Sequence, residues 1–203
     1  MATKEKTLFF RDDGTILIKN VRLAYEHCFK PWRKTDKERL KFSGRFLLDG
    51  KERADDIKAL RDHNKKLQQE HFKGNIKPAD LYFRDGDQAG KEEFEGMWYI
   101  AASENEDRPP QLLRPDKKPC KQSDDLIYSG AMVNVIIRPW AQNNDHGKKL
   151  NANLLVVQHK AHNDKFGNGG AANVDTDGLD EEEFEGAEDD GLDNDDGFGG
   201  DDE

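Results

Sequence analysis

The chain has 203 residues and a mass of 23.2 kDa, with 32 basic and 42 acidic side chains and a formal net charge of −10. Its size suits one domain with a single core and excludes two independent enzyme domains. No uninterrupted apolar stretch approaches the roughly 20 residues that span a bilayer, and residues 1–10 lack the apolar centre of a signal peptide, so we expect no membrane contact and a cytoplasmic location.

The charge is unevenly distributed along the chain. Residues 171–203 contain 16 Asp and Glu and no Lys or Arg, which leaves 42 − 16 = 26 acids against 32 bases, a net +6, in residues 1–170. We therefore predict a basic folded domain over 1–170 and a disordered acidic tail over 171–203, because the tail has too little apolar surface to offset its ordering entropy. The two cysteines, Cys28 and Cys120, show no CxxC spacing and indicate neither a disulfide framework nor a zinc site.

The first two predicted strands cover 15–25 and 40–48. In the first, apolar residues change parity between Ile18 and Val21, which predicts a bulge near Lys19–Asn20. In the second, Phe42 and Phe46 alternate with Lys41 and Arg45, so that one face is apolar and the other basic.

A helix is predicted over 55–72. Acids occupy its first turn, Ile57, Leu60 and Leu67 mark an apolar face, and Gly74 can end it. Three further strands are predicted over 96–103, 132–140 and 150–159, the last two joined by a turn-rich segment at 143–147.

Five strands and one helix without βα alternation predict a mainly β protein. We expect a five-stranded, OB-fold-like antiparallel barrel with the amphipathic helix between the second and third strands. An SH3-like barrel and a β-sandwich are alternatives that the pattern leaves open.

Several aromatic side chains lie beside basic ones, as a single-stranded nucleic acid requires: cations neutralise phosphates and rings stack on unpaired bases. Core packing is the competing explanation for each ring. The segment 29–33 is the strongest candidate, because its aromatic and basic residues crowd an expected loop beside Pro31. We predict that bases stack on some of Tyr25, Trp32, Trp98, Tyr99 and Trp140, while Lys30, Arg33, Lys41, Arg45 and Arg138 contact phosphates.

The acidic tail contains a repeat, with Asp-Gly-Leu-Asp at 177–180 and again at 190–193, each followed by acids and a Phe. Spaced carboxylates and occasional aromatics resemble a phosphate backbone with bases, so such a tail could occupy the domain's own basic groove or bind partner proteins. The tail residues predicted to bind partners are Phe184, Asp195, Asp196, Phe198, Asp201, Asp202 and Glu203. An EF-hand is not indicated, because in 175–178 the Gly falls at the fourth position instead of the sixth.

Signals for an enzyme are weak. The sequence has no GxxxxGK[ST], GxSxG or HExxH motif, and the Asp116-Lys-Lys fragment lacks further carboxylates to hold a nuclease cation. We expect no catalytic residue, no metal site and no cofactor.

Three motifs and one strand, in this order, carry a resemblance: Leu81-Tyr-Phe-Arg-Asp-Gly-Asp87, Gly96-Met-Trp-Tyr-Ile-Ala-Ala-Ser103, Ile127-Tyr-Ser-Gly-Ala131 and Leu154-Leu-Val-Val-Gln158. Over about 16–170 the chain resembles a phage family of OB-fold single-stranded DNA-binding proteins, long filed under an unknown-function label. The resemblance implies a replication and recombination accessory protein in the cytoplasm of an infected bacterium. More distantly, the arrangement of a domain and an acidic tail is similar to that of other phage and bacterial single-strand binders, whose acidic C-termini recruit replication or recombination proteins. Those tails commonly end in an aromatic or hydrophobic residue, whereas this sequence closes with Gly-Gly-Asp-Asp-Glu.

We therefore expect a non-enzymatic, sequence-independent single-stranded DNA-binding protein whose acidic tail competes for the DNA groove. Two alternatives are an acidic interaction protein or nucleic-acid mimic that acts through its tail, and a metal-dependent nuclease. Duplex DNA and RNA stay open as ligands, since nothing in the sequence reads the 2′-hydroxyl, and the oligomeric state is not determined.

Overall fold

The computed structural model describes residues 5–74, 76–145 and 147–166. By its internal contacts the chain divides into Met1–Gly169 and Gly170–Glu203. The predicted boundary at 170, the tail over 171–203 and all seven tail residues named above lie outside the described residues.

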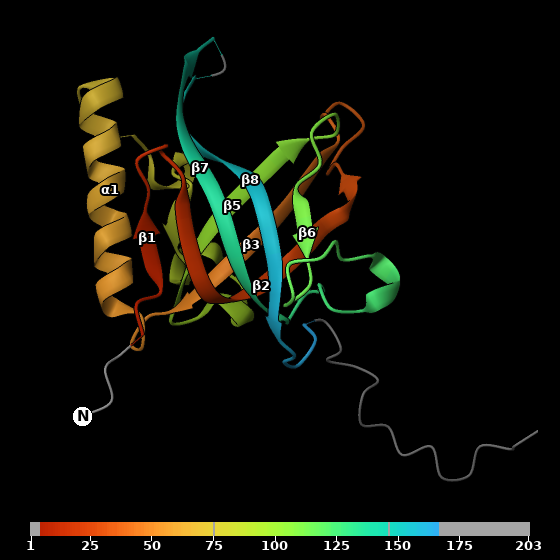
Figure 1. Cartoon of the computed structure of the whole chain (residues 1–203). Helices are drawn as coiled ribbons and strands as arrows, with labels where there is room; N and C mark the ends of the chain where they lie inside the picture. Colours follow the sequence, from red (N-terminus) through yellow and green to blue (C-terminus); the bar gives the residue numbers. More distant parts are fainter. Residues whose placement is uncertain (1–4, 75, 146, 167–203) are drawn as a thin grey trace, which may run out of the picture. The chain divides into compact units, whose positions relative to one another are not determined.

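Five long strands form a closed barrel, as predicted (Figure 1). They are β2 (Ile16–Trp32), β3 (Lys41–Asp49), β5 (Met97–Asn105), β7 (Met132–Asn144) and β8 (Gly147–Ala161). Antiparallel pairs join β5 to β3, β3 to β2, β2 to β7 and β7 to β8, and a parallel pairing at Ser103 and Asn153 closes the ring between β5 and β8. This is the strand arrangement of an OB-fold barrel, with one sparsely paired seam.

Short elements extend this barrel. Strand β1 (Leu8–Phe10) pairs with β2, β4 (Phe83–Asp85) with β5, and β6 (Gln111–Leu113) with β8. At three residues each, they are too short for a period-2 pattern to reveal them. The 3-10 helices are Pro78–Asp80, Asp87–Ala89, Glu92–Phe94 and Gln122–Asp124.

The predicted bulge in β2 is confirmed. The register to β7 shifts between Ile18 and Val21, and Asn20 adopts a left-handed φ of 55°. Arg53 donates to the carbonyls of Lys19 (3.1 Å) and Asn20 (2.9 Å), and the side chain of Asn134 accepts from the Asn20 amide. Partners far away in the chain therefore hold the bulge in place.

The loop expected at 29–33 is largely strand, which corrects the prediction. Strand β2 continues to Trp32, with Pro31 inside it. The β2–β3 register shifts between His27 and Trp32, so Pro31 lies where the ladder is irregular and a missing amide donor is tolerated.

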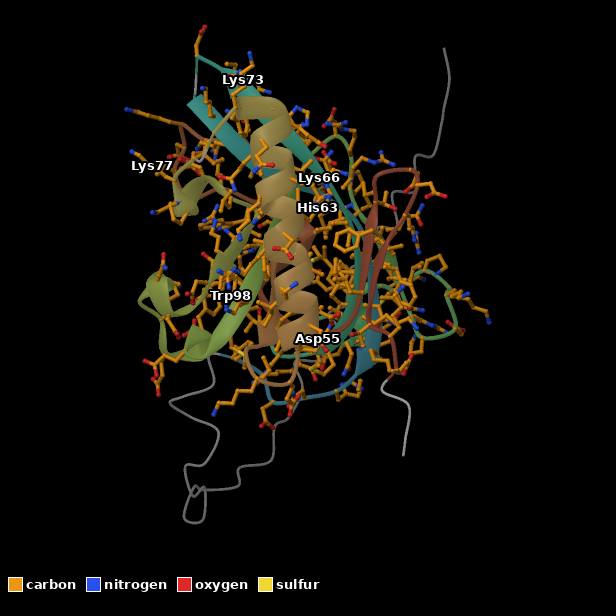
Figure 2. All side chains as sticks on the ribbon, turned by 90° about the vertical axis from the view of Figure 1, so that its left-hand side faces the viewer. Asp55, His63, Lys66, Lys73, Lys77 and Trp98 are labelled. Atoms are coloured by element: carbon orange, nitrogen blue, oxygen red, sulfur yellow. The ribbon has the colours of Figure 1, made fainter. Side chains whose placement is uncertain are left out.

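Helix α1 (Ala54–Phe72) lies between β3 and β5 in the chain, as predicted, and packs beside the barrel (Figures 1 and 2). It buries Ile57, Leu60, Asn64, Gln68 and Phe72. The left-handed residue at its end is Lys73, with φ 52°, and Gly74 follows it. Asp56 anchors the first turn, since it accepts from Thr7 Oγ1 (2.6 Å) and pairs with Arg53 (2.7 Å).

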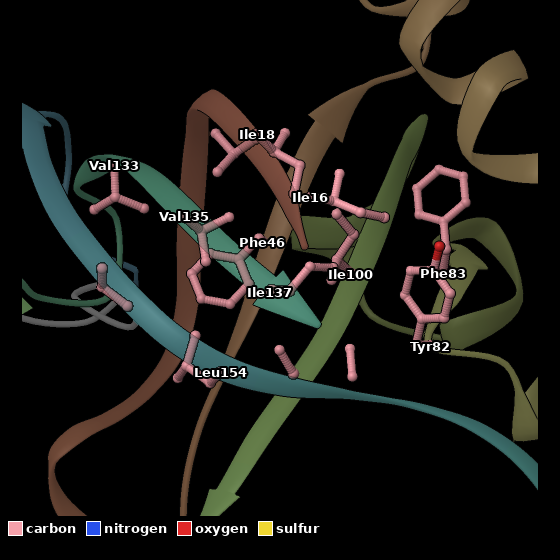
Figure 3. Packing of buried hydrophobic residues seen from close by; sticks show 14 of the residues in the cluster. Ile16, Ile18, Phe46, Tyr82, Phe83, Ile100, Val133, Val135, Ile137 and Leu154 are labelled. Carbon is pink, nitrogen blue, oxygen red and sulfur yellow. The ribbon is translucent and has the colours of Figure 1, made fainter. Parts of the chain in front are cut away.

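Alternation along the barrel strands separates the core from the outer face. Ile16, Phe46, Ile100, Val135 and Leu154 are all at most 1% exposed and meet inside the barrel (Figure 3). The side chains between them point outward. Position in this alternation therefore decides which residues can form a surface site.

Candidate nucleic-acid interface

A groove follows the sparsely paired seam between β5 and β8. It consists of two adjoining hollows of about 660 and 670 Å³, which share Arg39, Lys41, Ser103, Asn151 and Ala152. Its walls are the loop between β2 and β3, the outer face of β3 and the β7–β8 hairpin. We call this surface the seam groove.

The seam groove is strongly basic. Its lining contains two carboxylates, Glu38 and Glu104, against eight cations: Arg33, Lys34, Arg39, Lys41, Arg45, Arg84, Arg108 and Arg138. Two of the cations form ion pairs, Arg33 with Asp36 (2.9 Å) and Arg108 with Glu104 (3.2 Å). The other six have no carboxylate within ion-pair distance among the described residues, so the groove presents a net positive potential to an anion.

Arg45 and Arg84 are the most constrained of these unpaired cations. Burial, and then the charge of Arg84, lower the pKa of the Arg45 guanidinium. Arg45 donates to the Gly44 carbonyl (3.3 Å), and Arg84 donates through Nε to the Leu81 carbonyl. Two neighbouring guanidinium groups without an acid between them favour the binding of an anion such as phosphate.

Two tryptophans expose their rings in the seam groove. Trp32 is 50% exposed and lines the hollow beside the β2–β3 loop, and Trp140 is 43% exposed and lines the hollow beside the β7–β8 hairpin. His27 stacks on Trp32 with ring centroids 4.9 Å apart and planes 8° apart, which orients the indole. Exposed rings beside unpaired cations are the combination that binds unpaired bases and their phosphates.

The alternation predicted for 40–48 is confirmed. Phe42 and Phe46 are buried, while Lys41 and Arg45 point into the groove. The structure also brings Trp32, Arg33, Arg138 and Trp140 of the predicted site residues to the same groove.

Four predicted site residues lie elsewhere. Lys30 is exposed on β2 outside the groove lining, and half-buried Trp98 lies beside helix α1. Tyr99 is only 7% exposed beneath Phe94, with ring centroids 4.8 Å apart, so stacking of Tyr99 on a base does not fit its placement. The short segment after β4 covers it, which local periodicity could not reveal.

Tyr25 is held in a separate cluster. It is 40% exposed with a left-handed φ of 50°, and the Lys91 ammonium lies 3.9 Å from its ring centroid. Its hydroxyl donates to Glu93, and this bond is the main cause that lowers the pKa of the Glu93 carboxyl. Tyr25 therefore helps to hold the segment that covers Tyr99, and it lies outside the groove.

The sequence-based prediction missed several groove residues. Arg39 shares the outward parity of Lys41, and Arg84 belongs to the Arg-Asp-Gly-Asp motif, so both carried a signal. Strand pairing brings the polar Ser103, Asn151 and Asn153 to the groove, and Lys34 and Arg108 reach it from the loops that follow β2 and β5.

Asp116, the fragment considered for a nuclease, lies in an exposed turn. It pairs with Arg114 (3.4 Å) and Lys118 (3.5 Å), and the Lys118 amide is the main cause that lowers the pKa of its carboxyl. Within the described part of the chain, no three His, Cys, Asp or Glu residues gather as metal ligands, and no helix is long and apolar enough to cross a membrane.

The end of the described chain packs on the outer face of the barrel. The Arg22 guanidinium lies 3.9 Å from the Phe166 ring centroid and donates to the Asp164 carbonyl (2.9 Å). Gly130 permits this approach, since a Cβ there would lie 2.1 Å from the Asp164 oxygen. Phe166 and the groove residue Ala101 pack against one cluster, formed by Ala24, Leu47, Phe94 and Tyr99.

The closed five-stranded barrel and its groove place the protein among the OB-fold proteins, which use this outer face and its flanking loops to bind oligonucleotides or oligosaccharides. The chain belongs to the family described as Enterobacter phage Enc34, ssDNA-binding protein, whose family model matches residues 14–190.

Individual relatives agree with this assignment. The chain is 31% identical over 169 residues to protein p50 of Acyrthosiphon pisum secondary endosymbiont phage 1, covering 78% of this chain and 90% of that protein. The structure of the single-stranded DNA-binding protein from bacteriophage Enc34 in complex with ssDNA matches with a TM-score of 0.72 and 32% identity, over 82% of this chain and 97% of that one. A second structure of the Enc34 protein matches with a TM-score of 0.69 and 32% identity, over 86% and 94% of the two chains.

Proposed function

We propose that this protein binds single-stranded DNA without sequence preference and without catalysis. The observation that carries the proposal is the seam groove, in which six unpaired cations accompany two exposed tryptophans on an OB-fold barrel. A relative 32% identical over most of both chains is a single-stranded DNA-binding protein with a structure in complex with ssDNA.

The chemistry of the groove explains both the affinity and the lack of base reading. Cations neutralise phosphates and release their counterions, whatever the base. Trp32 and Trp140 offer ring faces, and stacking is sequence-tolerant because every base has a π-face. A duplex keeps its bases stacked on each other, so the ring contacts favour an unpaired strand.

The proposed biological role is to coat single strands exposed during phage replication and recombination, in the cytoplasm of the infected bacterium. Family membership supports this role. No step of it needs a nucleophile, a metal or a cofactor.

We further propose that the acidic tail competes with DNA for the seam groove and, when displaced, recruits replication or recombination proteins. The difference in charge supports this proposal, since residues 171–203 contain 16 acids and no bases, whereas residues 1–170 have a net charge of +6. Phe166, which precedes the tail by a few residues, packs against the cluster that Ala101 shares with the groove.

Fluorescence anisotropy with labelled oligothymidine, duplex DNA and RNA, each titrated with salt, tests the proposal. We expect oligothymidine to bind most tightly, and we expect its affinity to fall steeply as the salt concentration rises. Indifference of both the full chain and residues 1–170 to oligothymidine at low salt would refute the function. A lack of oligothymidine binding, together with an activity that is lost when the tail is removed, would favour the nucleic-acid mimic. Cleavage of the oligonucleotide in magnesium would favour the nuclease.

A further inference from the structure

A third hollow, of about 840 Å³, lies between helix α1 and strands β4 and β5. We call it the helix-side pocket and define it by Arg61, Asn64 and Lys65 of α1, Phe83 and Arg84 of β4, and Trp98 of β5. Figure 2 shows Trp98 beside the helix. Neither the barrel core nor the seam groove accounts for this pocket.

The Trp98 ring has a cationic neighbour. Its centroid lies 5.1 Å from that of buried Phe83, and the Arg61 guanidinium lies 5.1 Å from the Trp98 centroid. Arg61 is exposed, and no carboxylate among the described residues lies within ion-pair distance of it. A flat group could therefore stack on Trp98 with a mobile guanidinium beside it.

Asn64 leaves a hydrogen-bond acceptor without a partner in the pocket wall. Its side chain is 3% exposed and donates through Nδ2 to the Phe83 carbonyl (3.1 Å), which fixes the orientation of the amide. Its Oδ1 is buried and has no hydrogen-bond partner among the described residues. This oxygen has almost no solvent-accessible surface, so it lies behind the pocket wall, where a ligand in the pocket does not reach it.

Arg84 connects this pocket to the seam groove, because its side chain lines both. The pocket lining contains three cations, Arg61, Lys65 and Arg84, against one carboxylate, Asp85. A phosphate held by Arg84 would therefore have one neighbouring nucleotide in the groove and the next at the pocket.

We propose that the helix-side pocket takes an unpaired base from the strand that lies in the seam groove, an inference that rests on the proposed function. The base stacks on Trp98 beside Arg61, and Arg84 holds the phosphate that joins it to the strand in the groove. Every base has a π-face that can stack on Trp98, so the pocket extends the binding site without reading sequence.

Full-length protein and oligothymidines of two lengths test this proposal, about 6 nucleotides for the seam groove alone and about 14 for both sites. Trp98→Leu should weaken the longer oligonucleotide about 5- to 150-fold, the range for one base–aromatic stack, and leave the shorter one unchanged. Arg61→Gln should weaken the longer one about 2- to 30-fold, as loss of a cation beside an aromatic ring predicts. The matched control is Lys66→Gln, which removes an exposed charge of the same helix outside the pocket lining.

Wild-type affinity of Arg61→Gln for the longer oligonucleotide would overturn the proposal, as would equal losses at both lengths. Because Arg61 is exposed, Arg61→Gln should fold normally, and it tests the proposal even if Trp98→Leu fails to fold. Failure of the wild type to bind either length would instead refute the proposed function itself.

Discussion

Replacing Arg45 should separate DNA binding from stability. The Arg45 guanidinium is half-buried beside Arg84 and has no carboxylate partner among the described residues. Arg45→Gln removes a charge that the folded protein holds at a cost, so we expect an equal or higher free energy of unfolding, by up to about 1 kcal/mol. The same variant loses a phosphate contact of about 1.5–3 kcal/mol, which weakens binding about 10- to 150-fold.

The salt dependence of DNA binding is a second quantity that the structure predicts. Six groove cations lack an ion pair among the described residues: Lys34, Arg39, Lys41, Arg45, Arg84 and Arg138. If each neutralises one phosphate, the slope of log affinity against log salt is about −0.7 × 6, or about −4, for a single strand. Affinity then falls about 300-fold between roughly 50 and 200 mM salt, and Arg45→Gln should reduce the slope by about 0.7.

Anisotropy titrations at several salt concentrations, together with thermal unfolding, measure both quantities. Lys160→Gln is the matched control, since it removes an exposed cation of β8 that has no ion pair among the described residues and does not line the groove. Its slope should equal that of the wild type. Arg45→Lys should keep the slope and lose part of the affinity. A destabilised Arg45→Gln that binds with wild-type affinity and slope would refute the reasoning.

Three further predictions concern other parts of the molecule. Trp140→Ala should weaken single-strand binding about 5- to 150-fold with an unchanged unfolding midpoint, because its ring is 43% exposed and contributes little to the core; wild-type affinity in anisotropy would exclude it from the site. A chain that ends at Gly170 should bind oligothymidine more tightly than the full chain at low salt and equally at high salt, because its net charge is +6 instead of −10; equal affinity at low salt would contradict competition by the tail. Burial lowers the pKa of His159 and of His63, so the unfolded chain binds a proton at each histidine more tightly than the folded chain does. The free energy of unfolding should therefore fall as the pH drops below about 6.5, by at most about 1.4 kcal/mol per pH unit for each histidine. Chemical denaturation at pH 7.5 and pH 5 measures this loss, which His159→Gln should reduce; an unchanged loss in that variant would assign it to other groups.

Local patterns in the sequence were accurate where a single element decides the outcome. The parity change between Ile18 and Val21 located the bulge, and the alternation over 40–48 separated the core face from the basic face. The pattern failed at Pro31, because an irregular register to β3 lets strand β2 continue through it. At Tyr99 the pattern did not reveal that another segment, here Phe94, covers a residue with outward parity.

By itself the sequence determined the class of fold, the five main strands, the helix and the separation of charge between domain and tail, since each depends on composition or on a period of a few residues. Only the tertiary structure decided which cations share a site. The parallel closure of β5 on β8 and the pairing of β3 with β5 bring Lys41, Arg84 and Arg138 to one groove. Periodicity states which face a side chain occupies, but not which strand lies beside it, and the groove depends on that neighbour.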